Sequence, residues 1–220
     1  MNIAKNLLQI KTELPETVRL LAVSKLQPES RIWAAYHKGQ RIFGESRAQE
    51  LLPKHANLPK DIEWHFVGHL QINKLKQIAP FIDTIQSIDS LKLLETADRA
   101  AGKFNRKINV LLQVHIAQEE TKFGFSFDEI EDFFKSGLFL SFENLTFSGL
   151  MGMATLTDDR EQIRKEFNSL AVLFQKIKAD YFAWNDTFKE LSMGMSGDYP
   201  IAVEEGCTMV RIGSKIFGAR

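Results

Sequence analysis

The chain has 220 residues, of which 44% are hydrophobic and 25% are charged, and this composition supports a folded globular core. Lys plus Arg and Asp plus Glu each total 28, so the basic excess of a general nucleic-acid binder is absent. A single cysteine, Cys207, excludes an intrachain disulfide, and no apolar stretch approaches the ~20 residues that cross a bilayer. We expect a cytoplasmic protein that binds neither nucleic acid nor membrane, with Cys207 as a small core residue.

The chain opens with an amphipathic pattern, MNIAKNLLQIKTELPE, which predicts a helix and lacks the cleavage region of a signal peptide. After it, short apolar runs alternate with longer helix-like stretches. Most of the short runs are apolar at both odd and even positions, which is typical of parallel strands buried on both faces. The predicted strands are 18–24, 41–44, 63–68, 84–87, 108–116, 145–151, 190–193 and 208–212. The predicted helices are 28–38, 46–55, 70–78, 90–101, 127–136, 158–179 and 199–205, with Asp89 or Ser90 and Thr157 or Asp158 as N-caps.

Strands that alternate with helices predict parallel βαβ units, and eight of them in about 220 residues predict one compact (β/α)8 barrel domain over 1–220. A doubly wound open sheet is the competing fold. In the phenylalanine-rich segment 123–147, apolar residues follow helical spacing through Phe133 and Phe134 and strand spacing afterwards, which predicts core packing. A barrel places its reactive residues just after the strands, at the carboxyl-terminal rim.

Lys25 stands at that position, at the end of the apolar run LLAVSK. One interpretation is a surface lysine that closes a strand. The other is a partly desolvated amine at the mouth of the barrel, where loss of water disfavours the ammonium form and the neutral amine can condense with a carbonyl.

The last two predicted strands lead into MGMSGD and RIGSKIFG, which place small residues at helix N-termini. Backbone N–H groups there suit a phosphate, and barrels often build a phosphate site from the loops after strands seven and eight. Ser196 and Ser214 add hydroxyl donors, and Gly213 permits a close approach of the backbone. The alternative is that these are ordinary turn residues.

Arg211 lies on the last predicted strand, where an unpaired buried charge is costly. It either forms a structural ion pair with a strand carboxylate such as Glu190 or fixes a ligand between Lys25 and the phosphate loops. An amine that captures carbonyls, two phosphate loops and one placed cation together describe a site for pyridoxal 5'-phosphate (PLP).

The chain also resembles the pyridoxal phosphate homeostasis proteins, the YggS/PROSC family, whose fold is related to the N-terminal barrel of alanine racemase. The matching stretches are LLAVSK, FGESRAQEL, WHFVGHLQINK, QSIDS, LLQVHIAQEETKFGF, SGLMGMA and the final thirty residues from LSMGMSGDYP onward. They cover nearly the whole length, and HFVGHLQINK and the final thirty residues are the most specific.

The resemblance implies that Lys25 forms the internal aldimine with PLP. It also implies that Ser196, Gly213 and Ser214 contact the phosphate with the Met195 backbone nearby, and that Arg211 faces the pyridine nitrogen. Because a guanidinium keeps its proton, the ring nitrogen would stay unprotonated, which discourages carbanion chemistry and favours holding the cofactor.

The sequence departs from the family at two positions. Ser46 stands where related sequences usually have Asn, and His115 stands where they usually have Asn in LLQVNI. We keep Ser46 and His69 as further cofactor-binding candidates, expect His115 to be a satisfied core or rim histidine, and predict no metal site from His65 and His69. Lys122 is either a secondary amine at the rim or a solvated loop lysine.

Three functions remain open. The first is intracellular PLP homeostasis without robust turnover, in which the protein stores the cofactor or transfers it to PLP-dependent apoenzymes. The second is a PLP-dependent amino-acid racemase, which needs a second acid–base group that alanine racemase takes from a C-terminal β-domain and a partner subunit. We expect that domain to be absent here and the protein to be a monomer. The third is a barrel that binds another phosphorylated metabolite without covalent capture.

Overall fold

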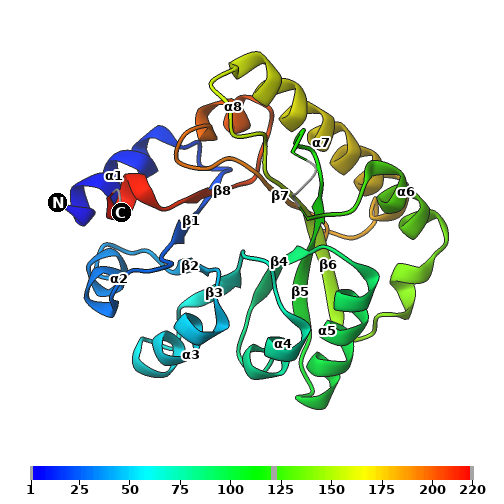
Figure 1. Ribbon diagram of the computed structural model, residues 1–220, viewed down its shortest axis with the longest axis horizontal. Helices are drawn as coiled ribbons and strands as arrows, with labels where there is room; N and C mark the ends of the chain where they lie inside the picture. The colour runs from blue at the N-terminus through cyan, green and yellow to red at the C-terminus, as the bar shows by residue number, and fades with distance from the viewer. Residues whose placement is uncertain (1, 120–122, 219–220) are drawn as a thin grey trace.

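The computed structural model describes residues 2–119 and 123–218, in which eight parallel strands close into a barrel with helices around the outside (Figure 1). Each strand pairs with the next one in the sequence, and β8 pairs with β1 to close the sheet. The strands are β1 Arg19–Val23, β2 Ile42–Glu45, β3 Glu63–Phe66, β4 Thr84–Ile88, β5 Ile108–Val114, β6 Leu145–Gly152, β7 Glu190–Ser192 and β8 Met209–Ile212. The helices are α1 Ile3–Glu13, α2 Glu29–Tyr36, α3 Ala48–Asn57, α4 Ile72–Ile78, α5 Leu91–Lys103, α6 Phe127–Lys135, α7 Arg160–Tyr181, α8 Tyr199–Glu204 and α9 Ser214–Phe217, with the 3-10 helix η1 Leu138–Ser141.

The predicted (β/α)8 barrel is confirmed, and the closed sheet excludes the open doubly wound alternative. Each predicted strand and helix range agrees with the structure to within two residues at either end. Ser90 caps α5 by accepting a hydrogen bond from the Leu93 N–H at 3.3 Å, which confirms one of the two predicted N-caps there.

The residues of η1 follow Gly137, whose φ of +72° turns the chain into a 3-10 helix between α6 and β6. One local prediction is wrong. Asp159, rather than Thr157 or Asp158, caps α7, because its carboxylate accepts hydrogen bonds from the N–H groups of Glu161 and Gln162. All three candidate residues favour N-caps, and side-chain chemistry alone does not choose among neighbours.

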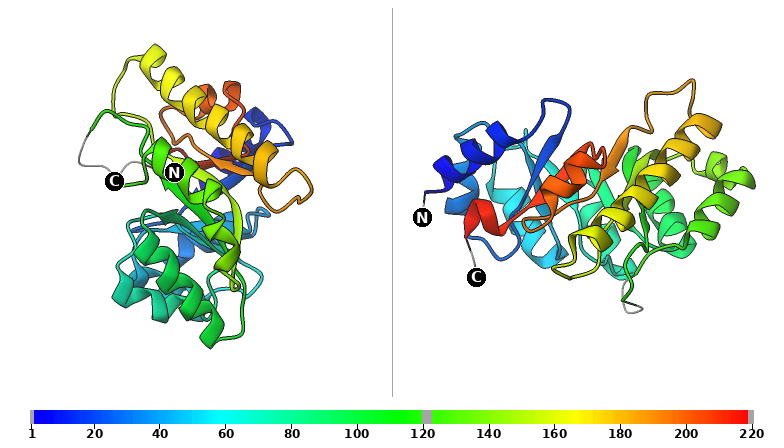
Figure 2. Two further views of the ribbon diagram at one scale, coloured as in Figure 1. Left: turned by 90° about the vertical axis from the view of Figure 1, so that its right-hand side faces the viewer. Right: turned by 90° about the horizontal axis from the view of Figure 1, so that it is seen from above.

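Most rings of the phenylalanine-rich segment pack as core, as predicted, whereas Phe123 is 56% exposed. The Phe134 ring lies edge-on to Phe188, with centroids 5.9 Å apart, and Phe188 stacks on Phe182 at 4.6 Å. These rings come from α6, the end of α7 and the connection to β7, so they join the helical layer to one side of the barrel (Figure 2).

The beginning and the end of the described chain lie side by side (Figures 1 and 2). Asn6 on α1 donates a side-chain hydrogen bond to the Ile216 carbonyl on α9 at 3.1 Å. Helix α9 follows β8 directly, so this contact supports the loop that ends the barrel. Among the described residues, no helix combines the length and the apolar character needed to span a bilayer.

Candidate functional site

A cavity of about 460 Å³ opens at the carboxyl ends of β1, β6, β7 and β8. All six residues predicted with definite roles, namely Lys25, Met195, Ser196, Arg211, Gly213 and Ser214, line this one cavity. The other lining residues are Val23, Gln27, Val67, Met153, Gly197 and Gly218. Among the described residues that line the cavity there are two cations and no carboxylate, so the site favours an anionic ligand.

The Arg211 side chain lies inside the barrel and is 4% exposed. Its Nη1 donates to Ser192 Oγ at 2.7 Å, and its Nη2 donates to the Gly152 carbonyl at 2.8 Å. Burial lowers the pKa of the Arg211 guanidinium to about 10, and the nearby Asp198 carboxylate acts in the opposite direction. At neutral pH the group therefore keeps its proton and its charge.

The alternative ion pair between Arg211 and Glu190 is wrong. Glu190 begins β7 at the opposite end of the barrel, where its Oε1 accepts a hydrogen bond from Arg19 Nη1 at 2.8 Å. In the part of the chain that the structure describes, no carboxylate lies within ion-pair distance of the Arg211 guanidinium.

A line of buried hydrogen bonds leads from Arg211 through the barrel. Ser192 Oγ donates to Gln86 Oε1 at 2.7 Å, and Gln86 Nε2 donates to His65 Nδ1 at 2.8 Å. His65 Nε2 in turn donates to Glu63 Oε1 at 2.7 Å. Because β4 and β7 are not neighbours in the sheet, the bond between Gln86 and Ser192 crosses the barrel interior. We call this line, from Arg211 to Glu63, the barrel relay.

The loops after β7 and β8 meet beside the cavity. Lys215 N–H on α9 points to Ser196 Oγ at 3.5 Å, so the two predicted phosphate loops lie against each other. A Cβ on Gly213 would lie 3.1 Å from the Val23 carbonyl oxygen, which is a tight contact, so glycine favours the close approach of this loop to β1. The Met195 N–H already donates to Asp198 Oδ1 at 2.5 Å, so Asp198 occupies the backbone donor expected at Met195.

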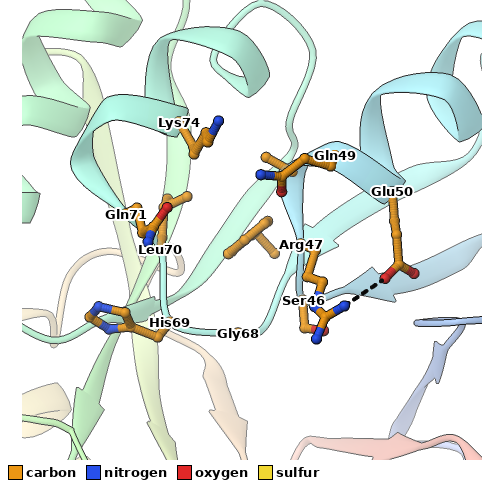
Figure 3. Close-up of a pocket in the computed structure, with 11 residues that line it drawn as sticks. Ser46, Arg47, Gln49, Glu50, Gly68, His69, Leu70, Gln71 and Lys74 are labelled. Atoms are coloured by element: carbon orange, nitrogen blue, oxygen red, sulfur yellow. Dashed lines mark ion pairs between the residues drawn. The ribbon is translucent and has the colours of Figure 1, made fainter.

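Ser46 and His69 line a separate cavity of about 640 Å³ beside α3 and α4 rather than the cavity of Lys25 (Figure 3). His69 Nδ1 lies 2.9 Å from Asp89 Oδ2, and the His69 ring stacks on Phe123 with centroids 4.1 Å apart. The structure therefore does not bring these two candidates together with the other six, and their contact with the cofactor stays a prediction.

The remaining reactive side chains lie away from the Lys25 cavity. His115 lies just beyond β5 and its Nε2 contacts the Glu119 carbonyl at 2.9 Å, which fits a satisfied rim histidine. Cys207 is 5% exposed within the core, and burial raises the pKa of its thiol to about 12. Lys122 lies outside the described residues. Within the described ranges, no group of three or more His, Cys, Asp or Glu side chains could hold a metal ion.

The apolar and small residues of the cavity wall were not predicted from the sequence. Val67 and Met153 each follow the end of a strand, β3 and β6, at the same rim as Lys25. Their position after a strand was a usable signal, but their side chains carry no chemistry that would single them out.

Comparison with known proteins shows the family of this chain. Over residues 1–220 the chain matches the family described as alanine racemase, N-terminal domain. A pyridoxal phosphate homeostasis protein of Vibrio alginolyticus is 41% identical over 211 residues, which are 94% of this chain and 88% of that relative. The chain belongs to the pyridoxal phosphate homeostasis protein family.

Solved structures extend the comparison within and beyond this family. PipY of Synechococcus elongatus, in its structure with PLP bound, is 34% identical with a TM-score of 0.88, over 98% of this chain and 100% of PipY. An alanine racemase of Clostridium difficile is 16% identical with a TM-score of 0.80, over all of this chain and 56% of the racemase. The family barrel and the racemase barrel therefore share a fold.

Proposed function

We propose that the protein binds PLP in the cavity of Lys25 and Arg211 and serves in the homeostasis of this cofactor. The single observation that carries the proposal is that all six residues predicted for the site line one cavity that has two cations and no described carboxylate. The names of the relatives and the PLP bound to PipY support the same assignment.

The residues present fit this ligand. When bound, PLP supplies an aldehyde that bonds reversibly to an amine and an aromatic ring that can withdraw electrons. Lys25 Nζ would supply the amine, while Ser196, Ser214 and the backbone at Gly213 would supply donors for a phosphate. Arg211 would face the ring nitrogen and keep its own proton, because its pKa of about 10 lies well above neutral pH.

Holding the cofactor is favoured over racemization by the position of the tyrosines. Tyr199 OH donates to Glu13 and Tyr36 OH donates to Asp61, while Tyr181 packs on the core beside Phe134. Hence none of the three tyrosines of the chain is among the described residues that line the Lys25 cavity. A two-base racemase needs a second acid–base group opposite the lysine, and these residues supply none there.

We further propose that the protein is a cytoplasmic monomer, a single domain that passes PLP to apoenzymes. The buried lone cysteine fits a reducing compartment. Size-exclusion chromatography with light scattering tests the monomer, and reactivation of a PLP-dependent apoenzyme by the loaded protein, with PLP removed from solution, tests transfer.

Borohydride reduction tests the central assignment. After incubation with PLP and reduction, we expect peptide mapping to find the pyridoxyl group on Lys25 and none on the Lys25→Ala variant. Lys38→Ala, a change at an exposed lysine of the loop after α2, serves as the matched control and should label like the wild type. A wild-type protein that binds PLP without forming an adduct would instead favour the non-covalent phosphometabolite barrel.

A further inference from the structure

The backbone on both sides of Lys25 is held by side chains of β2 and α3. Before it, Ser24 Oγ donates to Glu45 Oε1 at 2.6 Å, and the Ser24 carbonyl accepts from Lys54 Nζ at 2.9 Å. After it, the Leu26 N–H donates to Glu50 Oε2 at 2.6 Å. We call Glu45, Glu50 and Lys54 the backbone clamp.

The clamp consists of charges that are costly to bury. Glu45 is fully buried and Lys54 is 6% exposed, and Lys54 Nζ lies 2.7 Å from Glu45 Oε1 and 3.7 Å from Glu50 Oε2. Burial raises the pKa of the Glu45 carboxyl, and the Lys54 charge opposes that rise. A buried ion pair contributes less to stability than an apolar pair of similar size. We therefore attribute these charges to the fixed position of the backbone at Ser24 and Leu26 and not to overall stability.

The residue after Lys25 has a strained backbone. Leu26 has a φ of +62°, a conformation that is sterically unfavourable for a bulky residue. The Leu26 N–H donates its hydrogen bond to the Glu50 carboxylate, so the clamp holds the chain in this turn. Strained residues of this kind persist where the surrounding contacts fix them, and they cluster at functional sites.

We propose that Glu45, Glu50 and Lys54 are positioning residues that fix the backbone of Lys25 for the capture of an aldehyde. The proposal rests on the proposed function, in which Lys25 Nζ bonds to the aldehyde carbon while the carbonyl oxygen leaves as water with the two protons of the neutral amine. The clamp holds the backbone on either side of Lys25, and its three residues are not among the described residues that line the cavity. It acts by limiting the range of positions of Lys25, and orientation of this kind affects the rate of the bond-forming step.

Glu50 gives the sharpest test because its side chain is 22% exposed and its removal leaves the pair of Glu45 and Lys54 in place. Glu50→Ala removes the acceptor of the Leu26 N–H, whereas Glu50→Gln keeps an oxygen at that position. Glu95→Ala, at an exposed position of α5, is the matched control. Leu26→Gly is a second control, because glycine adopts the positive φ of this turn without strain and keeps the N–H that donates to Glu50.

Two measurements separate capture from binding. The first is the rate at which borohydride-trapped adduct accumulates on Lys25 after PLP is added. The second is the dissociation constant of pyridoxine 5'-phosphate, which carries an alcohol in place of the aldehyde and cannot be captured. We expect Glu50→Ala to slow capture about tenfold, and Leu26→Gly, Glu50→Gln and Glu95→Ala to stay within about twofold of wild type. Pyridoxine 5'-phosphate should bind all four variants within about twofold of the wild type.

The outcomes are distinguishable. Capture at the wild-type rate in Glu50→Ala overturns the positioning role and leaves the proposed function intact. Parallel losses of capture and of pyridoxine 5'-phosphate binding also overturn it, because they indicate general damage to the cavity. A wild-type protein that binds pyridoxine 5'-phosphate but never forms an adduct overturns capture by Lys25 itself.

Discussion

Arg211 carries its charge into the barrel interior, where its two hydrogen bonds go to a neutral hydroxyl and a backbone carbonyl. Burial of a charge without a carboxylate partner costs several kcal/mol. The side chain nevertheless remains protonated at neutral pH, because its lowered pKa is still about 10. A ligand in the adjoining cavity that binds the guanidinium would explain why this costly charge is buried here.

Arg211→Met should therefore separate stability from binding. We expect the variant to be more stable than wild type by about 1–3 kcal/mol in urea unfolding, because an apolar side chain of similar length replaces a buried charge. The dissociation constant for PLP should rise at least tenfold. Arg99→Met, a change at an exposed arginine of α5, should alter neither value. PLP binding equal to the wild type in Arg211→Met would refute the role given to this residue.

At the scale of elements, β6 depends on a single glycine to lie against β7. Gly149 has a φ of +150°, and a Cβ there would lie 1.8 Å from the Glu190 carbonyl oxygen. The pairing of β5 with β6 shifts register between Val110 and Leu111, at the same level of the barrel. This close backbone approach leaves no space for a side chain.

Gly149→Ala should consequently be among the most damaging small substitutions in the chain. We expect a loss of at least about 4 kcal/mol in unfolding free energy, or failure to fold, because the clash is with backbone. Gly39→Ala isolates the backbone term, since Gly39 has a φ of +80° but a Cβ there would meet no described atom within 4 Å. That variant should lose only about 1 kcal/mol. Equal losses in the two variants, measured by chemical denaturation, would contradict the steric argument.

The elements were predictable to a large extent, and for a physical reason. Strands buried on two faces must be apolar at both parities, so β5 and β6 are visible in the sequence without any partner. The convergence of Lys25 and Arg211 followed from the barrel, which brings all strand ends to one rim. The clamp was not predictable, because the contact of Lys54 with Ser24 depends on how far a side chain on α3 reaches toward β1.

At the scale of the whole molecule, the barrel relay joins the two ends of the barrel. Beyond Glu63 the line continues to Arg19 on β1. The Arg19 guanidinium donates hydrogen bonds to Glu63 on β3 and to Glu190 on β7. These contacts join β1, β3 and β7, none of which neighbours another in the sheet, at the end of the barrel opposite to Lys25. Every donor in the relay points from Arg211 toward the Glu63 carboxylate, so the buried charge and this carboxylate polarise one continuous line of hydrogen bonds.

Acid should loosen this end of the barrel first. Burial raises the pKa of Glu63, but the hydrogen bonds from His65 and Arg19 and the charge of Arg19 outweigh it and hold the pKa at about 2, below its ordinary 4.5. A carboxyl whose folded pKa is depressed contributes stability that is complete above the unfolded pKa and is lost as pH falls through the folded one. Between about pH 4.5 and pH 2 the wild type should therefore lose stability more steeply than Glu63→Gln, which cannot titrate at this position.

Unfolding free energies from urea titrations at several pH values test this, with Glu131→Gln, a change at a half-exposed carboxylate of α6, as the control that should follow the wild-type slope. Equal slopes for the wild type and Glu63→Gln would mean that the carboxylate of the relay does not contribute to closing the barrel.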